Sequence, residues 1–120
     1  MKMNDPSPTE TLASDRSHAL AGLITVAEGA IVSRVLASSG GGNVTLFAFD
    51  GGQGLSEHTA PFDALVQVID GGLEITIGGN VLKARRGEVV LMPADIPHAL
   101  QAPEPTRMLL TMLRDLKTGE

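Results

Sequence analysis

The sequence predicts an all-β fold, a sandwich or a barrel, from two observations. Short apolar or alternating segments fill most of the chain after residue 30, as β-strands do. Glycine clusters separate these segments at intervals of roughly 8–12 residues, and no long amphipathic helix is visible between them. About nine or ten short strands joined by such turns are typical of a β-sandwich or β-barrel.

The strands are expected in segments that are apolar or that alternate between apolar and polar residues. In chain order these are residues 23–28, 30–39, 44–49, 64–69, 73–77, 81–86, 88–93, 98–101 and 108–116. Residues 40–43, 70–72 and 78–80 predict tight turns, and Asp70-Gly71-Gly72 is typical of a hairpin. Residues 50–54 are expected to be a loop. The last segment has helix-forming residues but follows two prolines in an all-β chain, so we expect a strand that closes the barrel.

The composition excludes several classes of function. Hydrophobic residues make up 42% of the 120 residues, which is typical of a globular chain. The formal net charge of −5 repels nucleic-acid phosphates and anionic lipid, so we expect neither nucleic-acid nor membrane partners. Without Trp or Tyr, platforms that stack on sugars or bases are also disfavoured.

The chain is expected to form one domain. Residues 1–17 carry two prolines and many small polar groups, and we interpret them as a flexible N-terminal tail. Residues 18–120 then form a single barrel. No apolar signal segment opens the chain, no window is apolar enough to span a membrane, and no cysteine is present, so a cytoplasmic location is expected.

A histidine lies inside a segment bounded by glycines, residues 52–71. Gly52 is followed after five residues by His58, and alanine stands at Ala60 and Ala64. Imidazole is both a common metal ligand and an acid or base near neutral pH. His58 is therefore a candidate site residue.

A second histidine lies in residues 87–102. This segment opens on Gly87, passes through Pro93, which ends a strand, and reaches His98 directly after Pro97. Because proline fixes its own φ, Pro97 restricts the backbone just before the histidine. His98 is the second candidate site residue.

With these spacings the chain resembles the cupin superfamily, in particular its small single-domain members. The two cupin motifs read G-x5-H-x-H-x(3,4)-E-x6-G and G-x5-P-x-G-x2-H-x3-N. Here Ala60 and Ala64 replace the second histidine and the glutamate, and Asp95 and Ala102 replace a glycine and the asparagine. The resemblance implies a double-stranded β-helix, or jelly-roll, barrel of antiparallel strands that often dimerises, so a homodimer is expected.

The resemblance also implies a metal site, which this chain would hold in degenerate form. In metal-binding cupins two histidines and a glutamate of the first motif join one histidine of the second. Only His58 and His98 remain here as candidate ligands, and catalytic metal sites normally keep three. The candidate cofactor is therefore a weakly bound divalent ion, Fe, Mn, Ni or Zn. The side chains near the motifs that we considered as a third ligand are Gln53, Glu57, Asp63, Gln67 and Gln101.

We expect an unidentified small molecule to bind in the barrel around the two histidines, which are also the candidate catalytic residues. The expected pocket residues are Phe47, Phe49, His58, Ala60, Ala64, Val66, Met92 and His98. Leu65, Val89 and Leu91 are expected in the barrel core or pocket wall. Met108, Leu110 and Met112 are expected at a dimer surface, because methionine suits adaptable apolar contacts.

Three functions stay open at this point. The first is a small-molecule-binding barrel with a degenerate or absent metal site. The second is an enzyme, either a metal-dependent oxygenase or isomerase with an unidentified third ligand, or a metal-free acid–base enzyme that uses the histidines. The third is a structural or regulatory dimer module. The fold does not decide between them, because one fold can support unrelated chemistries.

Overall fold

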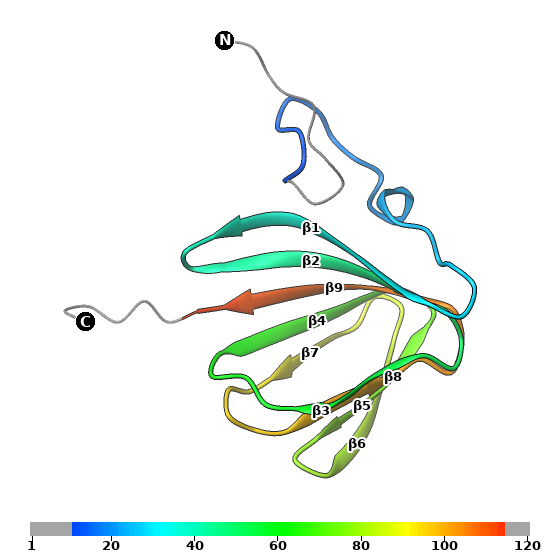
Figure 1. The fold of residues 1–120 in the computed structure, drawn as a ribbon, viewed down its shortest axis with the longest axis vertical. Coiled ribbons are helices and arrows are strands. Elements are labelled where there is room, and N and C mark those ends of the chain that lie inside the picture. The colour runs from blue at the N-terminus through cyan, green and yellow to red at the C-terminus, as the bar shows by residue number, and fades with distance from the viewer. Residues whose placement is uncertain (1–10, 115–120) are drawn as a thin grey trace, which may run out of the picture.

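The computed structural model describes residues 11–114, and its strands form two antiparallel sheets (Figure 1). Sheet A has the strand order β1-β2-β9-β4-β7 and sheet B the order β3-β8-β5-β6. The predicted all-β, double-stranded β-helix barrel is confirmed. In chain order the elements are η1 (Leu20–Leu23), β1 (Ile31–Ser39), β2 (Gly42–Phe49), β3 (Gly54–His58), β4 (Asp63–Asp70), β5 (Gly72–Ile77), β6 (Asn80–Arg85), β7 (Val89–Met92), β8 (His98–Gln101) and β9 (Thr106–Leu113). No helix in the described range is long and apolar enough to cross a membrane.

Two of the predicted glycine turns are tight hairpins. Ser39 pairs with Gly42, so two residues join β1 to β2. Ile77 pairs with Asn80, and the intervening Gly78 and Gly79 have φ values of 55° and 86°. Positive φ at both central positions is the backbone of a type I′ turn, which glycine adopts without a steric cost.

The hairpin predicted at Asp70-Gly71-Gly72 is wrong. β4 pairs with β7 and β9 in sheet A, whereas β5 pairs with β6 and β8 in sheet B. The glycines therefore carry the chain from one sheet to the other. Gly71 has a φ of 80°, and a Cβ there would collide with the Pro105 carbonyl oxygen and with Thr106.

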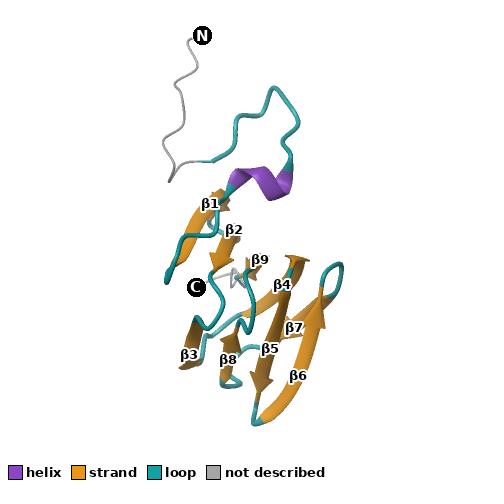
Figure 2. Cartoon of the chain, turned by 90° about the vertical axis from the view of Figure 1, so that its right-hand side faces the viewer, coloured by secondary structure: helices purple, strands orange, loops and turns teal. Residues whose placement is uncertain are grey.

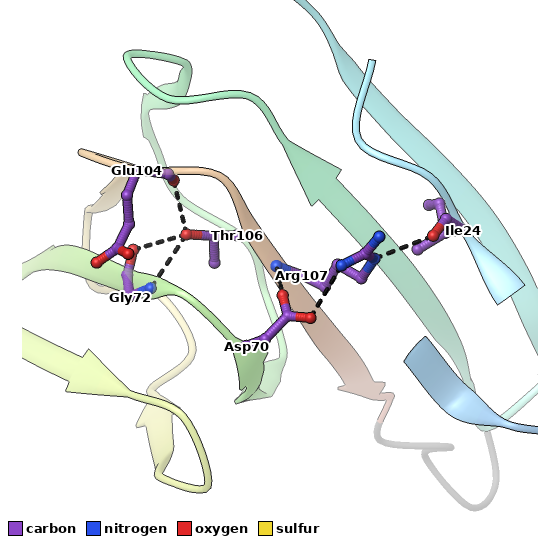
Figure 3. A network of polar contacts seen from close by, with 6 residues as sticks. All are labelled: Ile24, Asp70, Gly72, Glu104, Thr106 and Arg107. Atoms are coloured by element: carbon purple, nitrogen blue, oxygen red, sulfur yellow. Dashed lines mark hydrogen bonds and ion pairs between the residues drawn. The ribbon is translucent and has the colours of Figure 1, made fainter. Parts of the chain in front are cut away.

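The chain also crosses between the sheets beside this point, from β8 to β9. The fully buried Thr106 hydroxyl accepts a hydrogen bond from Gly72 N–H at 3.1 Å and lies within 2.9 Å of the Gly72 and Glu104 carbonyl oxygens (Figure 3). Next to it, the Arg107 guanidinium donates to the Asp70 carboxylate at 2.9 Å and to the Ile24 carbonyl oxygen at 3.0 Å. These bonds tie the two crossings to each other and to the N-terminal segment.

The segment before β1 covers the outer face of sheet A at the β1–β2 end (Figures 1 and 2). Leu12 N–H donates to the Leu36 carbonyl oxygen at 3.0 Å, so part of the predicted tail contacts β1, while residues 1–10 lie outside the described residues. The strand predicted at 23–28 is wrong. Its apolar side chains pack onto the sheet face instead of pairing with an edge. The buried members of this outer cluster are Ile24, Leu36, Leu46 and Ala48.

The space between the sheets holds the main core. Its buried residues are Phe49, Ala64, Val66, Val68, Leu73, Ile75, Ala84, Met92, Leu100, Ala102 and Met108. The core prediction was wrong for Val89 and Leu91, which are 58% and 51% exposed because they lie on the outer face of the edge strand β7. The dimer-surface prediction is wrong for Met108, which is fully buried. Leu110 and Met112 are partly buried and pack against this core, and their place at a dimer surface stays a prediction.

Thr106→Val tests the tie between the two crossings. Valine keeps the shape of threonine but leaves the buried N–H of Gly72 without this partner, so we expect a loss of about 2 kcal/mol in the free energy of unfolding. Urea denaturation measures the change. Thr111→Val is the matched control on the same strand, since the Thr111 hydroxyl has no side-chain hydrogen bond to the described residues, and it should change stability by under about 0.5 kcal/mol. Equal effects of the two substitutions would contradict the role of Thr106.

Candidate functional site

A cavity of about 50 Å³ lies inside one end of the barrel, where several strands begin or end. It is lined by Leu55, His58, Ala60, Phe62, Ala64, Met92, His98, Leu100, Met108, Leu110 and Met112. Both sheets contribute, since β3 and β8 of sheet B carry the histidines and β4, β7 and β9 of sheet A carry Ala64 and the methionines. The two sequence segments that carried the histidines therefore meet in one place.

His58 reaches this cavity because β3 has an irregular register. Leu55 pairs with Leu100, but His58 pairs with His98. Between these two pairs β3 advances by three residues while β8 advances by two. Successive side chains on a regular strand alternate between faces, and one extra residue reverses that alternation. Leu55 and His58 consequently both face the cavity. The sequence analysis missed β3, because its polar residues show no alternation.

The two imidazoles face each other across the β3–β8 ladder. Their Nε2 atoms are 3.1 Å apart, and the rings meet at an interplanar angle of 70°. His98 is buried at 5% exposure, whereas His58 is exposed at the mouth of the cavity. The pair thus connects the apolar interior to solvent.

Hydrogen bonds on the far side of each ring determine what these Nε2 atoms can do. His58 Nδ1 lies 2.9 Å from the Ser56 carbonyl oxygen, and His98 Nδ1 lies 3.2 Å from the Ile96 carbonyl oxygen. A carbonyl oxygen only accepts, so each Nδ1 is assigned the proton and donates it. In two neutral rings both Nε2 atoms then present lone pairs. Two acceptors at this distance attract each other only through a shared proton, a donor group or a cation, so the pair is an acceptor site.

A divalent metal of the kind that the motif resemblance implies fits these residues poorly. Ala60 and Ala64 line the cavity where two more ligands would stand, and alanine offers no donor atom. Among the described residues no three His, Cys, Asp or Glu side chains come together as a metal-binding group. Two neutral imidazoles without a carboxylate give a divalent ion few donors and no protein anion.

The side chains considered as a third ligand do not line the cavity. The Asp63 carboxylate accepts a hydrogen bond from Ala94 N–H at 2.8 Å, and the Gln101 amide donates to the Gly52 carbonyl oxygen at 3.0 Å. Gln53, Glu57 and Gln67 are also absent from the lining residues. Both Glu57 and Gln67 are exposed. The cavity wall is therefore apolar except at the two histidines.

Five of the expected pocket residues lie around the cavity: His58, Ala60, Ala64, Met92 and His98. Phe47, Phe49 and Val66 belong instead to the packed core and are not among the lining residues. The sequence analysis missed Leu55, Phe62, Leu100, Met108, Leu110 and Met112 as lining residues. Met108, Leu110 and Met112 share one face of β9, which was the available signal. Because the other face also carries two leucines, the inward face was not identified.

The loop before His98 is held against the loop after His58. Asp95 N–H donates to the Ala60 carbonyl oxygen at 2.8 Å. Asp95 has a φ of 65°, the left-handed conformation that glycine adopts freely and that aspartate tolerates better than most residues. Asp95 stands where the second motif has glycine. The positive φ expected at that position is therefore present although the residue is not glycine.

Comparisons with known proteins point to one family. A family model described as "Cupin domain" matches residues 45–113. A conserved protein of unknown function from Streptococcus pyogenes is 31% identical, with a TM-score of 0.85 over 95% of this chain and 100% of that chain. A cupin superfamily protein from Desulfitobacterium hafniense is 28% identical, with a TM-score of 0.82 over 91% and 100% of the two chains. An RmlC-like cupin from Desulfovibrio desulfuricans is 26% identical, with a TM-score of 0.72 over 82% and 95%. No curated protein matches the sequence significantly.

Asp95→Gly and Asp95→Ala test the strained position in the loop. Both substitutions remove the same carboxylate, but only glycine lacks the Cβ that disfavours a positive φ. We expect the alanine variant to be less stable than the glycine variant by about 1 kcal/mol. Thermal unfolding of the two variants beside the unmodified protein measures the difference, and an alanine variant as stable as the glycine variant would contradict it.

Ala60→His with Ala64→Glu tests whether these two positions face the histidines. The double substitution adds an imidazole and a carboxylate to the same cavity, so we expect about one divalent metal ion per chain, against far less in the unmodified protein. Elemental analysis of untagged protein measures the metal, and thermal unfolding verifies the fold. A folded variant that gains no affinity for Zn²⁺ or Ni²⁺ would mean that the two positions are placed wrongly.

Proposed function

The chain belongs to the cupin family, and we propose that it binds a small, largely apolar organic molecule inside the barrel, anchored by His58 and His98. The ligand class is an alcohol, a phenol or another molecule with one hydrogen-bond donor on an apolar body. Binding, without a metal-dependent reaction, is the function that this donor set supports best.

The pairing of the two Nε2 atoms carries this proposal. They are acceptors that meet 3.1 Å apart at the edge of an otherwise apolar cavity. A buried acceptor without a donor costs free energy, so a ligand that brings an O–H or N–H group to the pair is favoured over one that does not. Small-molecule sites are commonly of this kind, mostly apolar with a few polar groups that fix the orientation.

The size of the cavity limits the ligand. About 50 Å³ is less than the space that a benzene-sized guest fills in an apolar cavity, so binding a phenol requires the wall to move. Three of the lining residues are methionines, Met92, Met108 and Met112, and methionine changes rotamer more readily than branched side chains. Under this proposal these methionines must therefore change rotamer when such a molecule enters.

A metal-dependent oxygenase or isomerase is supported less well. Such chemistry needs a metal that keeps both its protein ligands and open positions for substrate. Here the positions of the missing ligands, Ala60 and Ala64, carry methyl groups, and the nearby carboxylate of Asp63 holds a backbone N–H instead.

Phenol and toluene form a matched pair of probes for the proposed site. They have nearly the same shape, but only phenol has a donor. We expect phenol to bind about fivefold more tightly than toluene, which corresponds to one net hydrogen bond of about 1 kcal/mol. Ligand-observed NMR titration of both compounds measures the ratio of the dissociation constants.

The ratio of the phenol and toluene dissociation constants, measured in two variants, shows whether His98 accepts the hydrogen bond from phenol. His98→Ala should bring the ratio close to one, even if the enlarged cavity changes both affinities. His18→Ala is the matched control, because His18 lies in the N-terminal segment with its Nε2 3.0 Å from the Ala13 carbonyl oxygen. Equal binding of phenol and toluene by the unmodified protein, or a ratio that His98→Ala leaves unchanged, would contradict the proposal.

A further inference from the structure

Two arginines of sheet A reach carbonyl oxygens of the N-terminal segment. Arg34 Nη1 on β1 donates to the Leu23 carbonyl oxygen at 3.1 Å, and Arg107 Nε on β9 donates to the Ile24 carbonyl oxygen at 3.0 Å. Only Arg107 also has a carboxylate partner, Asp70. In the described part of the chain no carboxylate forms an ion pair with Arg34. The two side chains therefore share a kind of backbone contact but differ in how their charge is balanced.

The Arg34 guanidinium also retains unused hydrogen-bond donors. Only its Nη1 atom has an acceptor among residues 11–114, and its Nε atom is buried without one. A buried donor that lacks an acceptor costs free energy, and the cost is larger for a charged group. Nε and Nη2 form one edge of the guanidinium fork, which matches the two oxygens of a carboxylate. The unused edge of Arg34 therefore suits an anion of that shape.

A second cavity, of about 280 Å³, lies beside this side chain, between the N-terminal segment and β1. It shares no lining residue with the cavity that holds the histidines. Its lining combines the guanidinium with apolar side chains and two exposed hydroxyl groups, and includes Leu23, Ile24, Thr25, Val32, Ser33 and Arg34. The hydroxyls of Thr25 and Ser33 make no side-chain hydrogen bond to the described residues, so both are available to donate to a ligand oxygen.

A cation, hydroxyl donors and an apolar wall together suit a small organic acid. One arginine balances one negative charge, and no lysine or second arginine is among the lining residues. A monocarboxylate is therefore balanced, whereas a phosphate dianion would leave excess negative charge on a chain whose net charge is already −5. We propose that this cavity binds a short aliphatic carboxylic acid, with Arg34 as the anchor of the carboxylate and the apolar wall against the alkyl chain.

The N-terminal segment determines how far the acid reaches along the guanidinium. Nε is shielded from solvent, so a contact with both Nε and Nη2 requires the backbone at Leu23 to move outward. The short helix η1, which ends at Leu23, contains no buried residue, so few contacts oppose this movement. The bound carboxylate would then supply the acceptor that Nε lacks.

Titration of the full-length protein with sodium butyrate and with butyramide tests the site. The two probes have nearly the same shape, but only butyrate is charged. Amide chemical shifts of the ¹⁵N-labelled protein report where and how tightly each probe binds, at an ionic strength held constant with sodium chloride. We expect butyrate to bind about tenfold more tightly than butyramide, because a hydrogen bond between charged groups is stronger than one to a neutral amide. The shifts should be concentrated at residues 22–25 and 32–34.

Two substitutions of Arg34 separate the charge from the fork. Arg34→Gln removes the charge and should lower the butyrate affinity by about tenfold. Arg34→Lys keeps the charge but should still lower the affinity several-fold, because an ammonium group lacks the planar fork. Arg86→Gln is the matched control and should change nothing, because it removes the same charge from an exposed arginine that does not line the cavity. Thermal unfolding verifies the fold of each variant.

This experiment is independent of the phenol and toluene ratio, since His98→Ala should leave butyrate binding unchanged. Three results would overturn the proposal: butyrate that binds no more tightly than butyramide, full butyrate affinity in a folded Arg34→Gln variant, or shifts centred on His58 and His98. The comparison of the two probes uses the unmodified protein, so it decides the question even where a variant does not fold.

Discussion

Two adjacent crossings of the chain between its sheets, from β4 to β5 and from β8 to β9, are the constraint on which the rest of the barrel depends. β4 passes into β5 at Gly71, and β8 passes into β9 just before Thr106. The two crossings lie so close that only glycine fits at residue 71, and the Thr106 hydroxyl bonds directly across the gap to Gly72. Because these bonds are buried, they are costly to leave unmade, so the sheets are held together firmly at this end. The Arg107–Asp70 ion pair extends the tie to the outer face.

The cavity lies at the opposite end of the same strands. β4 begins at Asp63 and β9 ends at Leu113, far along each strand from the crossings at Asp70 and Thr106. There the chain also passes between the sheets, in the loops from β3 to β4 and from β7 to β8. At the cavity end, β3 and β8 of sheet B carry His58 and His98. Facing them, β4, β7 and β9 of sheet A carry Ala64 and the methionines. A site at this end can change its donor atoms without disturbing the tie that holds the fold.

The sequence was sufficient for the fold class, for most strands and for the meeting of the two histidines, because glycine turns and motif spacing are local properties. It was not sufficient where tertiary contacts override local pattern. β3 exists because β8 provides a partner, and the apolar alternation of residues 23–28 packs on a sheet face instead of in a ladder. The inward face of β9 was also not identified, because leucines occur on both faces of the strand. That ambiguity concealed Met112, and its pairing with Ala64 emerged only from the register of the sheet.

Ala64 shows how a small side chain can remove one ligand from a site while other functional side chains remain there. The loss of a carboxylate removes a hard, charged ligand, but it also frees space beside two flanking residues that are already on the inward face. In this chain both flanking residues carry sulfur. The preference of the site is then determined by what remains: two nitrogen acceptors oriented by backbone carbonyls, and an apolar, polarisable wall. In the proposed function these groups would select a ligand by the hydrogen bond that it donates and by its apolar body, instead of by charge.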